Sequence, residues 1–172
     1  MSAAFVCMEL LRVDAVSADE AEALLRTCCG ASRWVQRMVA ARPFGTRDRL
    51  LEASRVAWHD LEPGDWLEAF QHHPKIGDRD ALRATFADTR HLAAREQAGV
   101  DGAPEAILSA LAIENERYQQ KFGFIFIVCA TGLTADEMLA RLRARIPNDP
   151  VSELQVAAGE QAKITALRLS RL

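Results

Sequence analysis

Helix-start signals recur along this 172-residue chain and constrain its fold more than any other feature. Ser17-Ala18-Asp19-Glu20 and Thr134-Ala135-Asp136-Glu137 both match the capping box, in which a hydroxyl caps the helix and a glutamate reaches back to the cap backbone. Asp149-Pro150 adds an N-cap followed by a first-turn proline. Starts of this kind in both halves of the chain predict a mainly α-helical protein.

Apolar residues at helical spacing, together with glycine and proline breaks, predict the other helices. The predicted helices run from the Ser17 cap to before Gly30, from a Ser32 cap through Val39, from about Thr46 to Leu61, from Pro63 to Phe70, over the helix-prone stretch Asp80 to Val100, from Pro104 to Phe122, from the Thr134 cap to Ile146, and from about Pro150 to near the C-terminus.

The stretch from Phe124 to Cys129 breaks this pattern because it is β-branched and aromatic. It predicts a short extended segment, near residues 124–130, that is buried on both sides. The sequence has no internal repeat, low-complexity tract or linker. We therefore expect an all-α fold with one extended segment, forming a single domain over residues 1–172.

Charge and composition narrow the partners and the compartment. The net charge is −3 and the basic residues are spread along the chain, which argues against nucleic-acid binding and against a polybasic membrane patch. The longest apolar run, residues 122–130, is too short to span a bilayer, and no signal peptide is recognisable. We expect a soluble, cytoplasmic protein with free thiols. The C-terminal Ser170-Arg171-Leu172 is close to a peroxisomal address, which would matter only in a eukaryotic source.

Two of the four histidines stand side by side before a proline, in Gln71-His72-His73-Pro74. A residue before proline is pushed into extended backbone, and neighbouring side chains of extended backbone point to opposite sides. We therefore expect at most one of the two rings to serve a catalytic pocket. Histidine suits proton transfer near neutral pH, although on the residue types alone surface histidines in a helix-ending loop are the more common interpretation.

Other candidate residues carry little information alone. Glu96-Gln97 is typical of a solvated helix end, and Arg168 between two leucines is either a snorkelling residue or an anion clamp. An apolar neighbourhood predicts that Cys129 is a buried, inert thiol. There is no H-E-x-x-H, cysteine cluster, glycine-rich nucleotide loop or G-x-S-x-G, so we expect no metal and no nucleotide cofactor.

Taken together and in this order, the segments resemble a known family, the decarboxylases of 2-oxo-4-hydroxy-4-carboxy-5-ureidoimidazoline (OHCU), which form (S)-allantoin from a product of urate. The matching segments cover nearly the whole chain, and the His-Pro-x-Ile-Gly and Phe-Gly-Phe-x-Phe motifs are highly specific. They are Arg42-Pro43-Phe44, residues 66–78, residues 96–99, residues 115–132 and residues 164–169. The resemblance implies an all-α homodimer that acts on a small molecule without cofactor or metal.

Carried over by motif position, the resemblance implies that His73 is the catalytic histidine and Glu96 its acidic partner. Arg168 falls on the substrate-binding arginine. The other implied substrate-binding residues are Pro74, Gln97 and the segment Phe126, Ile127, Val128, Cys129 and Ala130, which offers main-chain groups. The family often has serine three residues before the glutamate. Ala93 stands there in this chain, so a hydroxyl contact to substrate is missing or is supplied by another residue.

Two other functions stay open on the residues alone. A helical module that binds small anions would keep Arg168 and the extended segment but give His73 and Glu96 no role. A helical interaction domain would use the stripes around Trp34, Trp58 and Trp66 as core or as a dimer face, and tryptophan stripes are more often core.

Overall fold

The computed structural model of the chain describes residues 11–73 and 105–172. Within those ranges every regular element is a helix and no strand forms, which confirms the all-α prediction. The helices are α1 (Arg12–Ala15), α2 (Ala18–Cys28), α3 (Ser32–Ala40), α4 (Arg47–His59), α5 (Pro63–Gln71), α8 (Glu105–Phe122), α9 (Ala135–Arg145) and α10 (Pro150–Leu169). The short α1 was not predicted, and the helix-prone stretch at residues 80–100 lies outside the described residues.

The predicted caps form at three of the helix starts. Ser17 and Thr134 complete capping boxes with Glu20 and Glu137, and Asp149 accepts hydrogen bonds from two amides of the first turn of α10. Each cap satisfies amide groups that have no partner within the helix. The sequence therefore specified these helix starts locally.

The cap predicted at Ser32 was wrong. Ser32 is the first residue of α3, after Ala31 as N-cap. Its hydroxyl donates to Glu68 of α5 at 2.6 Å, and its amide donates to the same carboxylate at 3.1 Å. The side chain thus ties α3 to α5, a contact that local spacing could not indicate.

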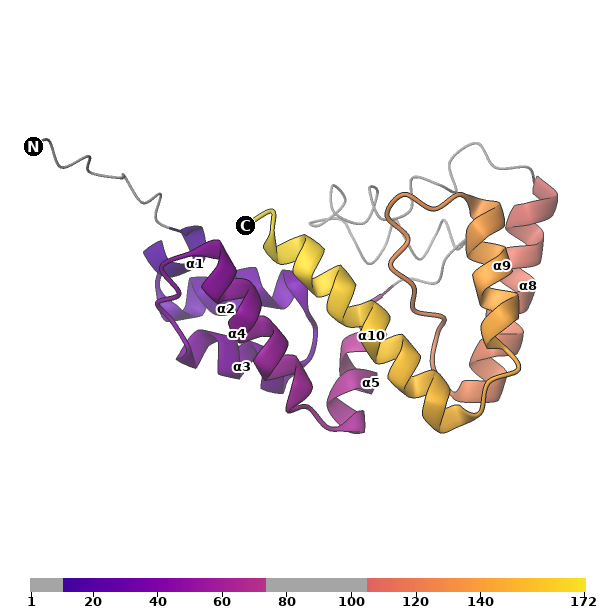
Figure 1. Cartoon of the computed structure of the whole chain (residues 1–172), viewed down its shortest axis with the longest axis horizontal. Coiled ribbons are helices and arrows are strands. Elements are labelled where there is room, and N and C mark those ends of the chain that lie inside the picture. The colour runs from indigo at the N-terminus through magenta and orange to yellow at the C-terminus, as the bar shows by residue number, and fades with distance from the viewer. Residues whose placement is uncertain (1–10, 74–104) are drawn as a thin grey trace, which may run out of the picture.

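Helix α10 crosses the molecule between two groups of helices (Figure 1). Its C-terminal part lies against α2 and α4, and it also contacts α5. Helices α8 and α9 pair with each other at the other end of the molecule, beyond the start of α10. A single helix therefore carries residues that face both groups.

The core is apolar and includes two of the three tryptophans. Trp34 and Met38 are fully buried, and Trp58 is 9% exposed. Trp66 is partly buried and packs against the same cluster. Fully burying a large apolar side chain stabilises the fold by about 1.5–3 kcal/mol, so the tryptophan stripes serve the core.

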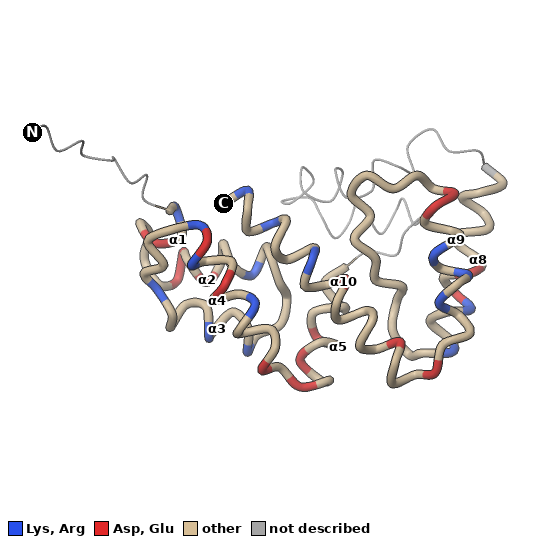
Figure 2. Tube along the Cα trace, in the orientation of Figure 1, with Lys and Arg blue, Asp and Glu red and all other residues tan. Residues whose placement is uncertain are grey.

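Charges of both signs are interspersed over the described helices. Figure 2 shows Lys and Arg interspersed with Asp and Glu on the helices at both ends of the molecule. In the ranges that the structure describes, no helix is both long enough and apolar enough to cross a bilayer.

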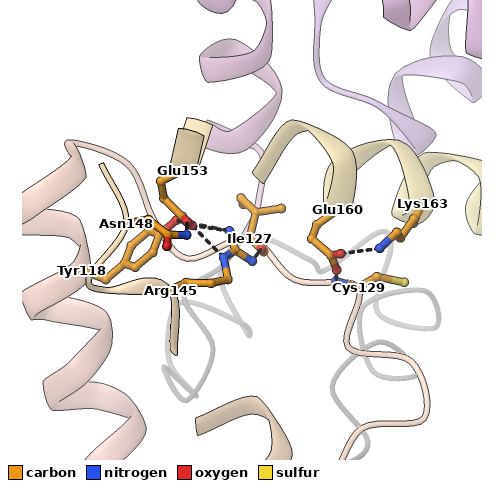
Figure 3. Close-up of polar contacts among 8 residues, drawn as sticks. All are labelled: Tyr118, Ile127, Cys129, Arg145, Asn148, Glu153, Glu160 and Lys163. Atoms are coloured by element: carbon orange, nitrogen blue, oxygen red, sulfur yellow. Dashed lines mark hydrogen bonds and ion pairs between the residues drawn. The ribbon is translucent and has the colours of Figure 1, made fainter. Parts of the chain in front are cut away.

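A buried polar cluster joins the α8–α9 pair to α10. Glu153, which is fully buried, accepts hydrogen bonds from Tyr118, from Arg145 Nε at 2.7 Å and from Asn148 Nδ2 at 2.7 Å. Figure 3 shows these side chains converging on the carboxylate of Glu153. We call Glu153, Arg145, Tyr118 and Asn148 the Glu153 cluster. Burial and the hydrogen bond to Glu153 raise the pKa of Tyr118, so its phenol stays protonated.

Candidate active site

The segment predicted to be extended follows α8 and is neither helix nor strand. Gly123, at φ 79°, ends α8 in a conformation that favours glycine. Phe126, Ile127, Val128 and Ala130 are buried, with exposed fractions of 2–6%. The predicted break between helices is thus confirmed, and most of the segment is buried, whereas Ile125 and Cys129 are only partly buried.

Two main-chain groups of this segment are already bound by the protein. Cys129 N donates to a Glu160 carboxylate oxygen at 2.8 Å, and Ile127 O accepts from Arg145 Nη1 at 2.7 Å (Figure 3). In this arrangement the Cys129 amide is not open to a ligand. The Cys129 side chain is partly exposed, so the expectation of a fully buried thiol was wrong.

The two adjacent histidines lie at the end of α5. His72 has φ −84° and ψ 4°, and the amides of His72 and His73 donate to the carbonyls of Ala69 and Phe70. The expectation of extended backbone was wrong at His72, because these bonds tighten the last turn and satisfy terminal carbonyls. His72 is exposed while His73 is partly buried, so the two residues differ in their access to solvent.

His72 packs against Gly30, in the turn between α2 and α3. A Cβ atom added at Gly30 would lie 2.1 Å from His72 Cδ2 and 2.3 Å from Cγ, far inside contact distance. The absence of a side chain at residue 30 therefore allows the end of α5 to approach α2 and α3. This contact fixes the end of α5 and therefore the backbone position of His73.

His73 has a strongly perturbed environment. Burial lowers its pKa to about 3, and the positive charge of Arg168 acts in the same direction. A hydrogen bond with the Gln161 side chain acts in the opposite direction. The imidazole is therefore neutral at pH 7, with one nitrogen carrying a proton and the other a lone pair.

Arg168 reaches the same region from α10. It is 6% exposed, and its Nη1 donates to the carbonyl of Thr27 at the end of α2, at 3.4 Å. The structure thus brings together His73 and Arg168, two of the predicted site residues that lie far apart in the sequence. A buried guanidinium beside a neutral histidine provides an anion anchor next to a group that can exchange a proton.

A cavity of about 300 Å³ opens beside His73, between the end of α5 and the end of α8. Its lining includes His73, Phe70, Gln119, Gly123 and Phe124. Segment 126–130 is not among the described residues that line it.

The buried Oε1 of Gln119 accepts no hydrogen bond in the described parts of the chain, which makes Gln119 a polar group that the sequence analysis missed. A single glutamine in a helix gives no sequence signal for such a role.

Four predicted site residues, Pro74, Ala93, Glu96 and Gln97, lie outside the described residues. Within the described ranges, no group of three or more His, Cys, Asp and Glu side chains is placed to hold a metal ion.

Comparison with known proteins places the chain in a family. The family model described as OHCU decarboxylase matches residues 14–170. The bifunctional uric acid degradation protein TTL of Arabidopsis thaliana is 36% identical over 147 residues, which are 86% of this chain and 45% of that protein. This chain therefore spans less than half of that relative. The OHCU decarboxylase of Amia calva is 36% identical over 135 residues, covering 76% of this chain and 74% of the relative.

Solved structures agree with the sequence comparison. A crystal structure of OHCU decarboxylase in the presence of (S)-allantoin superposes with a TM-score of 0.72 at 34% identity, covering 91% of this chain and 97% of that one. A structure of (S)-allantoin synthase, at 20% identity and a TM-score of 0.66, shares the fold. With the family match over residues 14–170 and this structural likeness, the chain belongs to the OHCU decarboxylase family.

Proposed function

We propose that the chain converts OHCU to (S)-allantoin and CO2, without cofactor or metal, in the degradation of urate. Its family membership and its likeness to a decarboxylase crystallised with (S)-allantoin support this reaction. One observation in this chain carries the proposal: the charge of the buried Arg168 on α10 acts on the partly buried His73 at the end of α5.

The chemistry of the substrate explains the need for these groups. OHCU carries a carboxylate and a hydroxyl on one ring carbon, next to a ring that accepts electrons. When CO2 leaves, its bonding electrons remain on the ring and are delocalised there. The protein must hold the anion, keep water away and manage protons, none of which needs a metal.

Arg168 anchors an anionic or carbonyl part of the substrate. Its planar guanidinium offers paired donors that match a carboxylate, and burial strengthens such a contact. A bound negative charge would offset the effect of Arg168 on His73. Substrate binding would thus raise the pKa of His73 and prepare the imidazole to accept a proton.

His73 and Glu96 share the proton transfers. One takes the hydroxyl proton, or delivers a proton to one face of the carbanion, and delivery to a single face yields one enantiomer of allantoin. Pro74, Gln97 and those main-chain groups of segment 126–130 that are not already bound by Glu160 or Arg145 complete the substrate contacts in this proposal. Ala93 supplies no hydroxyl, and the amide of Gln119, which lines the cavity beside His73, could supply a polar contact instead.

The test generates the unstable substrate in place from urate and follows CO2 release together with the optical rotation of allantoin. His73→Ala should lower kcat by about 100-fold or more, because general acid–base groups contribute about 10²- to 10⁴-fold. His72→Ala is the matched control, since its ring is exposed and lies against Gly30.

Full rate and full stereoselectivity in His73→Ala would remove His73 from the mechanism. Equal losses in His72→Ala and His73→Ala would also contradict the assignment. A parent protein that binds anions saturably but releases no CO2 from OHCU would favour the small-anion module. Absence of saturable small-molecule binding would favour the interaction domain.

We also propose that the protein is a cytoplasmic homodimer, on the basis of the family resemblance. Light scattering of the purified protein gives the mass of the assembly, and a monomer mass over the working concentration range would contradict the dimer. Fractionation of the source cells tests the compartment.

A further inference from the structure

Three polar side chains lie in a row on the buried face of α10. Gln161, Thr165 and Arg168 are spaced so that they share one side of the helix. Their exposed fractions are 0%, 1% and 6%. Polar groups that are buried this deeply are costly unless they are hydrogen-bonded, so their partners need an explanation.

The middle residue of the row orients its neighbour. Gln161 Nε2 donates to Thr165 Oγ1 at 3.2 Å. The Thr165 hydroxyl also bonds to the side chain of Cys29, which is 1% exposed and lies at the end of α2. Burial raises the pKa of Cys29 to about 12, so it stays a thiol. With its NH₂ group held by Thr165, Gln161 presents its amide oxygen in the other direction.

Gln161 Oε1 is buried and, among the residues that the structure describes, makes no hydrogen bond of standard geometry. The Gln161 side chain nevertheless acts on His73 as a hydrogen-bond partner that favours the protonated ring. An amide oxygen can accept a hydrogen bond from an imidazole N–H.

We propose that Gln161, held by Thr165, is a positioning residue for His73, accepting the N–H of one ring nitrogen and leaving the lone pair of the other for the substrate. This inference rests on the proposed function, in which His73 exchanges a proton. The partner of a histidine ring nitrogen fixes its tautomer and orientation. Gln161 is therefore expected to act on kcat through His73.

The chemistry of an amide suits this position better than that of a carboxylate. Gln161 is neutral, so it can accept from the ring without stabilising a permanent imidazolium beside Arg168. A glutamate at residue 161 would favour the charged ring and would compete with the substrate for the positive charge of Arg168. The amide thus adds no negative charge beside His73 and Arg168.

The experiment compares Gln161→Met with the same substitution at Gln155, an exposed residue of α10. Gln161→Met should lower kcat by about 10- to 100-fold, as loss of partners that orient a functional histidine does, with less than about a two-fold change in KM. Nitrogen NMR of the His73 ring, without substrate, should change from one tautomer to a mixture. Gln155→Met should change neither quantity.

Two further variants keep the test decisive if Gln161→Met folds poorly. Gln161→Glu should raise the pKa of His73 and move the acidic limb of the kcat profile to higher pH. Thr165→Val should lower kcat by releasing the amide, and Thr165→Ser, which keeps the hydroxyl, should restore most of that loss. Unchanged tautomer and unchanged kcat in Gln161→Met would overturn the inference. So would equal kcat in Thr165→Val and Thr165→Ser.

These outcomes separate this inference from the proposed function. If His73→Ala retains turnover, the proposed role of His73 fails, whatever the NMR spectrum shows. If His73→Ala is inactive while the ring tautomer ignores residue 161, the proposed function stands and the positioning role of Gln161 fails.

Discussion

Helix α10 carries two buried polar clusters that differ in how fully their groups are bound. In the Glu153 cluster, near the start of the helix, both carboxylate oxygens of Glu153 accept hydrogen bonds. The second cluster, here called the His73 cluster, consists of His73, Gln161, Thr165 and Arg168. There the amide oxygen of Gln161 is buried without a bond of standard geometry, and His73 borders a cavity.

The difference indicates two separate uses of buried polarity. The Glu153 cluster is closed: its donors and acceptors satisfy one another and connect the α8–α9 pair to α10. The His73 cluster holds a neutral imidazole beside a guanidinium, and this combination can receive an anion and exchange a proton. Breaking the first cluster should affect stability, and breaking the second should affect turnover.

Glu153→Ala should give the largest effect on stability. It leaves Arg145 mostly buried without its carboxylate, and removing one partner of a buried ion pair costs about 3–5 kcal/mol. Urea unfolding measures the loss. Glu52→Ala, which removes an exposed ion pair with Arg55, should change stability by less than about 0.5 kcal/mol. Similar values for both variants would mean that the Glu153 cluster does not hold the two ends together.

Arg168→Gln should instead lower turnover more than stability. The neutral side chain cannot offset the negative charge of the substrate, and we expect kcat/KM to fall by about 100-fold, since loss of a buried charge partner costs about 2–5 kcal/mol. Steady-state kinetics on substrate generated in place measures it. Arg171→Gln, at an exposed position of the C-terminus, is the control. A fall in folded protein that accounts for the whole loss would place Arg168 with the structural residues instead.

Gly30→Ala tests the contact that positions the His73 cluster. The added methyl group would overlap the ring of His72, and such overpacking costs about 1–3 kcal/mol. The thermal unfolding temperature and kcat should both decrease, because a shift of His72 also moves His73. Combining the substitution with His72→Gly removes both the ring and the Cβ atom, which would lie 2.8 Å from the added methyl group, and should recover most of both losses. A double variant as impaired as Gly30→Ala alone would show that the overlap is not the cause.

The pH dependence of stability should show the most gradual effect, because it is spread over several pH units. His73 has a pKa of about 3 in the folded protein, against an ordinary value of 6.5, so the unfolded chain takes up the proton first as pH falls. Its contribution is fully present above pH 6.5 and is lost towards pH 3, by at most about 1.4 kcal/mol per pH unit. Urea unfolding at a series of pH values should give a shallower decline for His73→Asn. Parallel curves would contradict the lowered pKa.

Much of the fold was predictable because its signals are local. The capping boxes at Ser17 and Thr134 and the Asp149 cap formed as predicted, since each satisfies amides within one helical turn. Ser32 failed as a cap because its partner, Glu68, lies on another helix, where it is reached only after the chain has folded.

The site was predictable only in part, for the same reason. Motif positions selected His73 and Arg168, which the structure places close enough for the charge of one to lower the pKa of the other. Gln161 and Thr165 gave no such signal, since a glutamine and a threonine four residues apart are ordinary in any helix. The roles of Gln161 and Thr165 depend on Cys29 and His73, which lie at the end of α2 and at the end of α5.

The sequence by itself determined the helical class, most helix boundaries and the family. Helix caps form between residues within one turn, and the order of the motifs is visible in the sequence itself. It also indicated that only one of the paired histidines would serve chemistry. Tertiary structure decided the rest: the approach of His72 to Gly30, the closed Glu153 cluster, and the lowered pKa of His73. Burial and charge proximity produce these properties, and both arise only when α10 packs against the helices on either side.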